Sequence, residues 1–247
     1  MKQVIKKSLQ KLHLYPIAED IIDIGKALKY QVHRRFGAVD RQLISNYLQQ
    51  NEIRKLHIGC GFNLIDGWLN SDYQPYPTDT LRLDATQTFP IEGNQFDYIF
   101  SEHMIEHIKY AEGLSMLAEG FRVLKKDGII RVSTPNLPFL IDLYRSDKSE
   151  QQIEYIKWAT DNFVAGNDYD DIFIINNFMR DWGHQFIYDE KTLRSSLEKV
   201  GFTNITRCEL NQSVAEPLRN LENEARLPAG FLRMETLTLE ATKLTNS

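Results

Sequence analysis

From Lys55 onward, short apolar runs typical of strands alternate with longer amphipathic runs typical of helices. The strand candidates cover residues 55–58, 68–72, 81–84, 96–101, 129–133, 203–210 and 234–241. The helix candidates cover residues 104–124, 136–147, 150–163 and 189–200, and residues 126–128 predict a turn. This alternation predicts an α/β fold, a doubly wound and mainly parallel seven-stranded sheet with helices on both faces.

Two stretches depart from the alternation. In residues 1–36 apolar side chains recur at helical spacing, with a break at Pro16, and residues 40–50 predict a second, short helix. Residues 164–188 are rich in Asn, Asp and aromatic side chains and predict an irregular insertion over the edge of the sheet. We therefore expect a helical N-terminal extension and one larger domain. Their ranges are 1–50 and 51–247, with an insertion or substrate cap around 148–188.

Charge is divided unevenly along the 247 residues. The formal total is −5, but residues 1–36 hold eight basic and three acidic residues, which gives +5 there and leaves −10 for the rest. An acidic body argues against a nucleic-acid partner. The two cysteines, Cys60 and Cys208, are too few for a disulfide scaffold or a multi-cysteine zinc module. No apolar run approaches the roughly 18 residues that span a bilayer, so we predict a cytoplasmic protein.

A glycine pair, Gly59 and Gly61, follows the first strand candidate and lets the backbone approach a ligand closely. Leu64 stands where a dinucleotide-binding loop has its third glycine, which disfavours a nicotinamide oxidoreductase. Asp72 and Asp84 end the next two strand candidates. Ligands of open α/β sheets bind at these strand ends, and two carboxylates there suit a ligand of nucleoside shape.

Together these segments resemble class I S-adenosylmethionine-dependent methyltransferases. The resemblance is carried by residues 56–61 (LHIGCG), 67–72 (GWLNSD), 83–85 (LDA), 96–103 (FDYIFSEH), 106–108 (EHI) and 121–132 (FRVLKKDGIIRV). It covers residues 55–136 well and 188–241 loosely. The most similar branch is a group of small predicted methyltransferases associated with bacterial surface-glycan or secondary-metabolite pathways.

The resemblance implies a Rossmann-like methyltransferase fold with an antiparallel last strand, and S-adenosylmethionine as the cofactor. It implies that Gly59 and Gly61 line the methionine end of the cofactor, Asp72 holds the ribose, and Asp84 with Ala85 meets the adenine. Ser101 and Glu102 would lie beside the methionine part, and His103 would face the substrate. We also assign to the cofactor site the residues beside the glycines, which are His57 and Cys60.

The first glycine loop departs from the family pattern. His57 stands where the family has an acidic residue, and no third glycine follows the pair. The link from Gly61 to Trp68 is too short for a normal crossover helix, so we expect that helix to be a single turn or missing.

Three histidines are candidates for catalysis. His103 and His107 are four residues apart at the start of a helix candidate, and a neutral imidazole can accept a hydroxyl proton near pH 7. His184 lies in the aromatic insertion and is the third candidate. The alternative for His103 and His107 is a polar wall or a role at the helix start, and the alternative for His184 is a hydrogen-bonded surface histidine. The glutamate between His103 and His107 is misplaced for a zinc protease motif, and residues 168–171 lack the spacing of a calcium loop, so no metal site is predicted.

We predict methyl transfer to a small-molecule or saccharide acceptor, most readily at oxygen. The alternative is a non-catalytic cofactor-binding adaptor that docks to a membrane or a partner through residues 1–36. Residues 1–36 have three open readings. They form a lid packed on the sheet, a basic helix that docks on a partner or on the inner, anionic face of a membrane, or a swapped arm of a homodimer.

Overall fold

The computed structural model describes residues 37–74, 79–164 and 168–244. The chain divides into two units, residues 1–46 and 47–247. The predicted basic arm, residues 1–36, lies outside the described residues. The helix predicted over residues 40–50 is confirmed as α3 (Ala38–Gln50).

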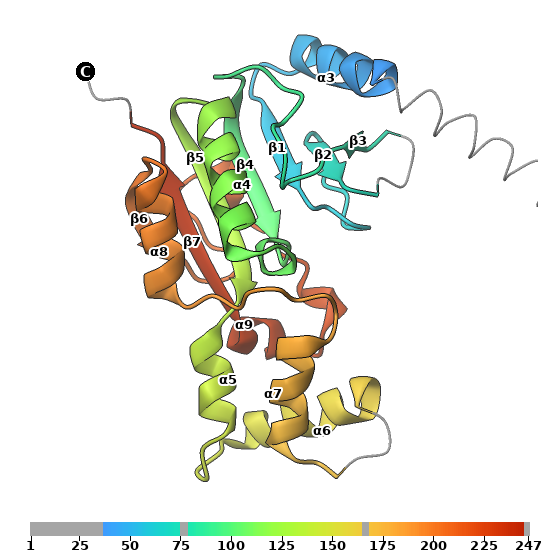
Figure 1. Ribbon diagram of the computed structural model, residues 1–247, viewed down its shortest axis with the longest axis vertical. Helices are drawn as coiled ribbons and strands as arrows, with labels where there is room; N and C mark the ends of the chain where they lie inside the picture. Colours follow the sequence, from blue (N-terminus) through green and yellow to red (C-terminus); the bar gives the residue numbers. More distant parts are fainter. Residues whose placement is uncertain (1–36, 75–78, 165–167, 245–247) are drawn as a thin grey trace, which may run out of the picture. The chain divides into compact units, whose positions relative to one another are not determined.

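One seven-stranded sheet forms the centre of the second unit, in the order β3-β2-β1-β4-β5-β7-β6 (Figure 1). The strands are β1 (Lys55–Ile58), β2 (Leu69–Asp72), β3 (Leu81–Arg82), β4 (Phe96–Glu102), β5 (Leu124–Pro135), β6 (Thr203–Arg207) and β7 (Thr236–Thr242). The first five strands pair in parallel, whereas β7 runs antiparallel to both β5 and β6. The predicted fold class and the antiparallel last strand are therefore confirmed.

The sheet is covered differently on its two faces. Helices α4 (Tyr110–Val123) and α8 (Glu190–Lys199) lie together on one face (Figure 1). Gly120 of α4 lies against Ile99 of β4 and Ile130 of β5, and a side-chain carbon at this position would be in ordinary contact with both. On the other face, Trp68 and Phe100 pack with leucines of the segment that contains the short helices η2 (Glu216–Leu218) and η3 (Glu224–Arg226).

The predicted helix over residues 104–124 is wrong in its first part. It divides into the 3-10 turn η1 (Ile105–His107) and helix α4, because Ile108 adopts an extended backbone between them. His103, just before η1, has a left-handed φ of 47°. The predicted turn at residues 126–128 falls within β5, in a stretch where the pairing with β4 is irregular and Asp127 has a left-handed φ of 62°. As expected, no helix joins β1 to β2.

A group of helices extends beyond the end of the sheet toward which β4 and β5 point (Figure 1). It comprises α5 (Leu137–Leu143), α6 (Glu150–Phe163), α7 (Asp171–Arg180) and α9 (Phe231–Glu235). The insertion predicted to be irregular thus contains a helix, α7, which Asp170 caps by accepting a hydrogen bond from the backbone N–H of Ile172. Phe139, Tyr155, Phe178 and Phe231 belong to the hydrophobic core of this group.

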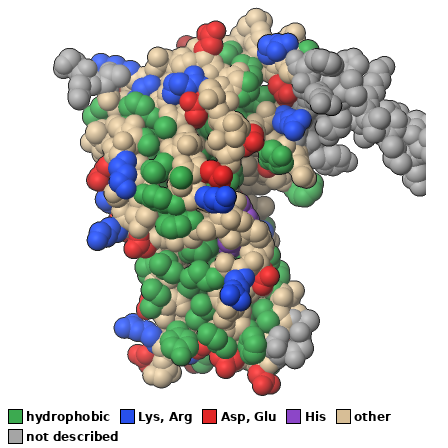
Figure 2. Space-filling view, in the orientation of Figure 1, with side chains coloured by type: hydrophobic (Ala, Val, Ile, Leu, Met, Phe, Trp, Pro, Cys, Tyr) green, Lys and Arg blue, Asp and Glu red, His purple; other side chains and the backbone are tan. Residues whose placement is uncertain are grey.

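Hydrophobic side chains are also exposed on these helices, as Figure 2 shows over their lower part. They include Ile141, Tyr144, Ile153 and Ile172. Among the described residues, no helix combines the length and the apolar character needed to cross a membrane.

Candidate functional site

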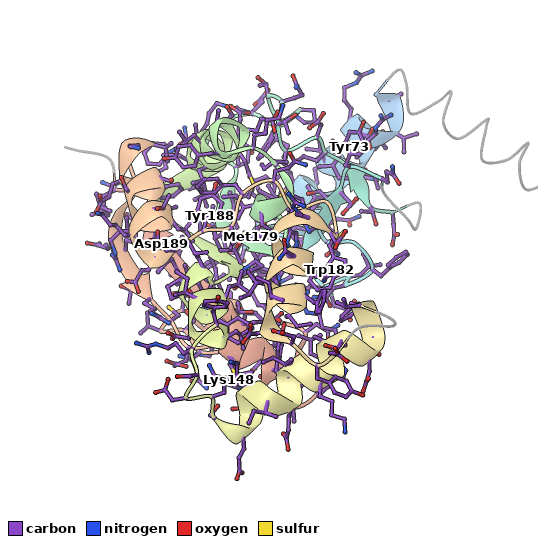
Figure 3. All side chains as sticks on the ribbon, turned by 60° about the horizontal axis from the view of Figure 1, so that its bottom comes forward. Tyr73, Lys148, Met179, Trp182, Tyr188 and Asp189 are labelled. Carbon is purple, nitrogen blue, oxygen red and sulfur yellow. The ribbon has the colours of Figure 1, made fainter. Side chains whose placement is uncertain are left out.

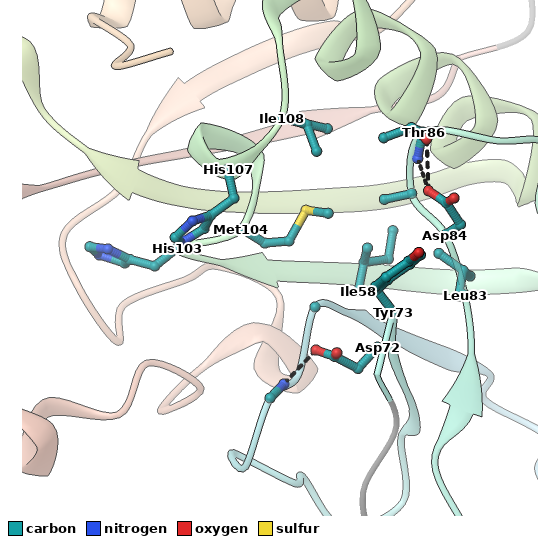
Figure 4. Close-up of a pocket in the computed structure, with 13 residues that line it drawn as sticks. Ile58, Asp72, Tyr73, Leu83, Asp84, Thr86, His103, Met104, His107 and Ile108 are labelled. Atoms are coloured by element: carbon teal, nitrogen blue, oxygen red, sulfur yellow. Dashed lines mark hydrogen bonds between the residues drawn. The ribbon is translucent and has the colours of Figure 1, made fainter. Parts of the chain in front are cut away.

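A pocket of about 610 Å³ opens at the carboxyl ends of β1, β2 and β3. It is lined by Ile58, Gly59, Gly61, Asp72, Tyr73, Leu83, Asp84, Ala85, Thr86, His103, Met104, His107 and Ile108 (Figure 4). This is the edge at which open α/β sheets bind their ligands, and the volume is within the usual range for a small-molecule site.

The two glycines form the floor of this pocket in different ways. Both adopt left-handed backbones, with φ of 71° at Gly59 and 49° at Gly61. A side-chain carbon at Gly59 would overlap Met104, so this glycine permits close packing of the loop against the segment after β4. A side-chain carbon at Gly61 would meet nothing within 4 Å. The second glycine therefore exposes backbone to the open pocket, where a ligand can approach it.

The two predicted aspartates both line the pocket, and each forms hydrogen bonds within its own loop (Figure 4). Asp72 accepts a hydrogen bond of 3.0 Å from the backbone N–H of Gly61 and one of 2.9 Å from that of Gln74. Asp84 accepts from the backbone N–H and the hydroxyl of Thr86, and both bonds use the same carboxylate oxygen. Each carboxylate is thus held in place at the rim, and Asp84 keeps its second oxygen for a ligand.

Four predicted cofactor residues do not line the pocket. His57 is 1% exposed and lies inside the sheet region, where its Nδ1 is 3.2 Å from the side-chain oxygen of Asn70. Burial lowers the pKa of His57 to about 4. Cys60 is also buried, and desolvation raises the pKa of its thiol to about 12, so it is no nucleophile at neutral pH.

Ser101 and Glu102 are buried at the end of β4. The side chain of Glu102 accepts hydrogen bonds from Asn63 and from the backbone of Asn223, and it lies 3.7 Å from the guanidinium of Arg226. Burial raises the pKa of Glu102. Glu102 thus ties the glycine loop to the segment that contains η3, a role that its strand-end position did not indicate.

Tyr73, Thr86, Met104 and Ile108 also line the pocket but were not predicted. Tyr73 and Thr86 directly follow the predicted strand-end segments, so their sequence position was the available signal. Met104 and Ile108 carried no comparable signal, because their place depends on the division of the predicted helix into η1 and α4.

A second pocket, of about 250 Å³, shares His103 and His107 with the first. Its other lining residues are Glu106, Pro135, Tyr155, Trp158, Phe163, Phe178, Trp182, His184, Arg226, Leu227 and Glu235. Most of its aromatic side chains come from α6, α7 and the turn after α7, where Figure 3 labels Trp182. The structure thus brings His184 together with His103 and His107, although His184 is far from them in the sequence.

His103 stands where the two pockets meet, and both of its ring nitrogens have neighbours. Nε2 is 2.9 Å from the hydroxyl of Thr236, and Nδ1 is 3.4 Å from Oε1 of Glu106. Glu106 is fully buried and was not among the predicted site residues. Burial raises the pKa of Glu106, but its interaction with the imidazole of His103, 3.4 Å away, and the charge of His107 outweigh burial, so the net shift is downward.

Comparison with known proteins gives one family match. Residues 56–132 match the model of a family described as "Methyltransferase domain". That range contains all the lining residues of the larger pocket. No curated protein sequence matches the chain.

Solved structures with similar folds share little sequence with this chain. A SAM-dependent methyltransferase from Archaeoglobus fulgidus is 16% identical over 82% of this chain and 94% of its own, with a TM-score of 0.47. A possible histamine N-methyltransferase from Thermotoga maritima is 16% identical over 86% and 95%, with a TM-score of 0.46. The CurJ carbon methyltransferase is 13% identical over 78% of this chain, with a TM-score of 0.43, and this chain spans about half of it (49%).

Proposed function

We propose that this chain, whose residues 56–132 match a methyltransferase domain, uses S-adenosylmethionine to methylate a hydroxyl oxygen of a small-molecule or glycan-like acceptor. The observation that carries this proposal is the pair of adjoining pockets, which have His103 and His107 as common walls. The larger pocket suits the cofactor and the aromatic one suits the acceptor.

The residues of the larger pocket fit the cofactor. Asp72 is placed to bind the ribose hydroxyls and Asp84, with Ala85, to meet the adenine. The open space at Gly61 leaves room for the methionine part beside exposed backbone. The bound cofactor supplies a methyl group on a positively charged sulfur, which is already activated, so the main task of the protein is to align donor and acceptor.

The aromatic pocket supports the choice of acceptor. Tyr155, Trp158, Phe163, Phe178 and Trp182 offer flat apolar surfaces, and all belong to the cap proposed around residues 148–188. Aromatic faces stack against the apolar face of a sugar or another ring, while a few polar groups fix its hydroxyls. Arg226 and Glu235 line the same pocket and provide such polar groups.

His103 is the residue we assign to proton removal. It lines both pockets, so its ring lies between the proposed donor and acceptor. Glu106 lies next to Nδ1 and orients the ring, while Nε2 faces the hydroxyl of Thr236. With the cofactor bound, His103 would accept the proton of the acceptor hydroxyl as the oxygen forms its bond to the methyl carbon. The electron pair of the broken carbon–sulfur bond would stay on the sulfur. His107 and His184 are the other two proposed catalytic residues.

Calorimetry with S-adenosylhomocysteine tests the cofactor site in wild type, Asp72→Ala and Gly61→Ala. We expect the wild type to bind, and both variants to bind at least about tenfold more weakly, because one loses a carboxylate and the other fills the open space. Gly67→Ala is the matched control. Gly67 also has a left-handed backbone (φ 73°) and lies outside the pocket lining.

Equal loss of binding in the Gly61 and Gly67 variants would assign the effect to backbone strain and remove the cofactor from this pocket. A radiolabelled methyl donor then tests the reaction on acceptor libraries of glycans and small hydroxyl compounds. Transfer to amine acceptors with none to hydroxyl acceptors would contradict O-methylation.

The charge of residues 1–36 supports a second proposal, peripheral contact with an anionic membrane surface. These residues carry a formal charge of +5 and lie outside the described structure. A basic amphipathic helix binds such surfaces through its charge and its apolar face.

A further inference from the structure

We propose that Glu106, His107 and His184 bind one divalent transition-metal ion at the boundary between the two pockets. Each offers one ligand atom, and the three atoms all lie within 4.8 Å of one another. Ligands of a zinc-like ion lie about 2.0–2.2 Å from it, so two of them are at most about 4.4 Å apart. Small side-chain adjustments therefore complete the set.

Two of the three side chains form a hydrogen bond through the atom that would not bind the ion, as metal ligands usually do. Nδ1 of His184 is 2.7 Å from the carbonyl oxygen of Phe178. Since a carbonyl only accepts, Nδ1 carries the proton and Nε2 presents its lone pair. The hydroxyl of Thr134 donates to Oε2 of Glu106 at 3.0 Å.

The other carboxylate oxygen of Glu106, Oε1, has surroundings that need an explanation. Oε1 is buried and accepts no hydrogen bond from any described residue, although Nδ1 of His103 lies 3.4 Å away. A buried carboxylate oxygen without a hydrogen bond is costly to keep. A cation at the proposed position would bind this oxygen and remove that cost.

The backbone fixes the two segments that supply the ligands. The carbonyl oxygen of Glu106 accepts hydrogen bonds of 2.7 Å and 3.1 Å from the backbone N–H groups of Gln185 and Phe186. Gly183, with φ of 77°, turns the chain before His184, and the rings of His107 and His184 lie edge to face with centroids 4.9 Å apart. The arrangement thus belongs to a fixed turn rather than to two independent side chains.

The donor set selects the kind of ion. Two imidazoles and one carboxylate favour zinc-like first-row ions over Mg²⁺ and Ca²⁺, which prefer oxygen ligands. Three protein ligands leave a position open, and His107 and His184 both line the proposed acceptor pocket. An ion there would act as a Lewis acid on a bound hydroxyl oxygen. The sequence predicted no metal site, because that prediction considered only the spacing of residues close together in the sequence. His184 is distant from Glu106 and His107 in the sequence, so the proposed site has no such local pattern.

Metal binding is measured on the full chain, purified without a histidine tag and treated with a chelator. We expect one equivalent of Zn²⁺ to bind in calorimetry, and Co²⁺ to give visible absorption bands of a low-coordinate nitrogen and oxygen site. His184→Ala, His107→Ala and Glu106→Gln should each weaken Zn²⁺ binding at least about tenfold. His13→Ala combined with His33→Ala is the matched control, since it removes histidines outside the cluster.

Circular dichroism and thermal unfolding verify that each variant is folded. If His184→Ala is not folded, His184→Asn takes its place. Unchanged Zn²⁺ affinity in the folded His184 and His107 variants would overturn the proposal, as would loss of binding in the His13 and His33 control. Absence of Zn²⁺ and Co²⁺ binding to the wild type at micromolar concentration would also overturn it. Binding of S-adenosylhomocysteine, measured separately, distinguishes failure of this site from failure of the cofactor pocket.

Discussion

His57 occupies the position at which the resembling family has an acidic residue, and its surroundings explain how a histidine is tolerated there. Its ring packs 5.0 Å from that of Phe100 and contacts Asn70, so it is accommodated as a neutral, buried group. Desolvation by burial lowers its pKa to about 4, against an ordinary value of about 6.5.

This shift predicts a pH dependence of stability. Between about pH 6.5 and 4 the unfolded chain binds a proton at His57 that the folded chain does not. The stability that neutral His57 contributes to the folded state is therefore complete above pH 6.5 and is lost as the pH falls toward 4. We expect the free energy of unfolding, measured in urea, to fall in the wild type when the pH is lowered from 7.5 to 5. In His57→Gln the fall should be smaller by about 2 kcal/mol. Parallel pH profiles for the two proteins would contradict the assignment.

The place of single residues was predictable where position along the chain decides it. Asp72, Asp84, Gly59 and Gly61 lie at or just after the ends of β1, β2 and β3, and all four line the pocket at that edge of the sheet. Glu106 was not predictable, because its importance comes from His184, which the fold brings to it from a distant turn. Glu102 was assigned to the cofactor, whereas its side chain contacts Asn63 and Asn223.

At the scale of elements, ion pairs of a buried arginine, Arg131, link β5 to β7. Arg131 is fully buried, and its guanidinium lies 2.6 Å from carboxylate oxygens of both Glu222 and Glu240. It also donates to the carbonyl oxygen of Gln212. One side chain on β5 thus holds the neighbouring strand and the segment that covers the sheet.

Arg131→Met should destabilise the protein by about 3–5 kcal/mol, because it leaves two buried carboxylates without their cation. Urea unfolding followed by circular dichroism measures the change. Arg207→Met is the matched control, since Arg207 pairs with Glu190 at an exposed site and should contribute less than about 1 kcal/mol. Similar losses in both variants would show that burial does not strengthen the role of Arg131.

Most elements were predictable because their apolar periods are strong and their ends carry clear signals. Helix α8 begins after Asp189, which caps the backbone N–H of Thr192, and α6 begins after Ser149 in the same way. Helix α7 was missed because its Asn and Asp residues resemble a loop, although Asp170 is a cap. The division of residues 104–124 into η1 and α4 was missed, because the apolar periodicity of a helix continues across Ile108. The helical backbone is interrupted there, since Ile108 is extended.

At the scale of the whole chain, charge is divided unevenly. Residues 1–36 carry +5 and residues 37–247 carry −10. Every residue that lines the proposed cofactor pocket lies between Ile58 and Ile108, within the second unit. The proposed membrane contact and the proposed cofactor pocket therefore involve different parts of the chain and can be tested separately.

Reversing four charges near the start, with Lys2, Lys6, Lys7 and Lys11 each replaced by Glu, should abolish sedimentation with phosphatidylserine vesicles. Each basic residue near an anionic surface contributes about 1 kcal/mol, and salt screens this attraction, so binding of the wild type should fall as salt rises. Calorimetry with S-adenosylhomocysteine should give the same affinity in both proteins. Vesicle binding that survives the four reversals and high salt would exclude an electrostatic arm and leave the lid and the swapped arm as the readings of residues 1–36.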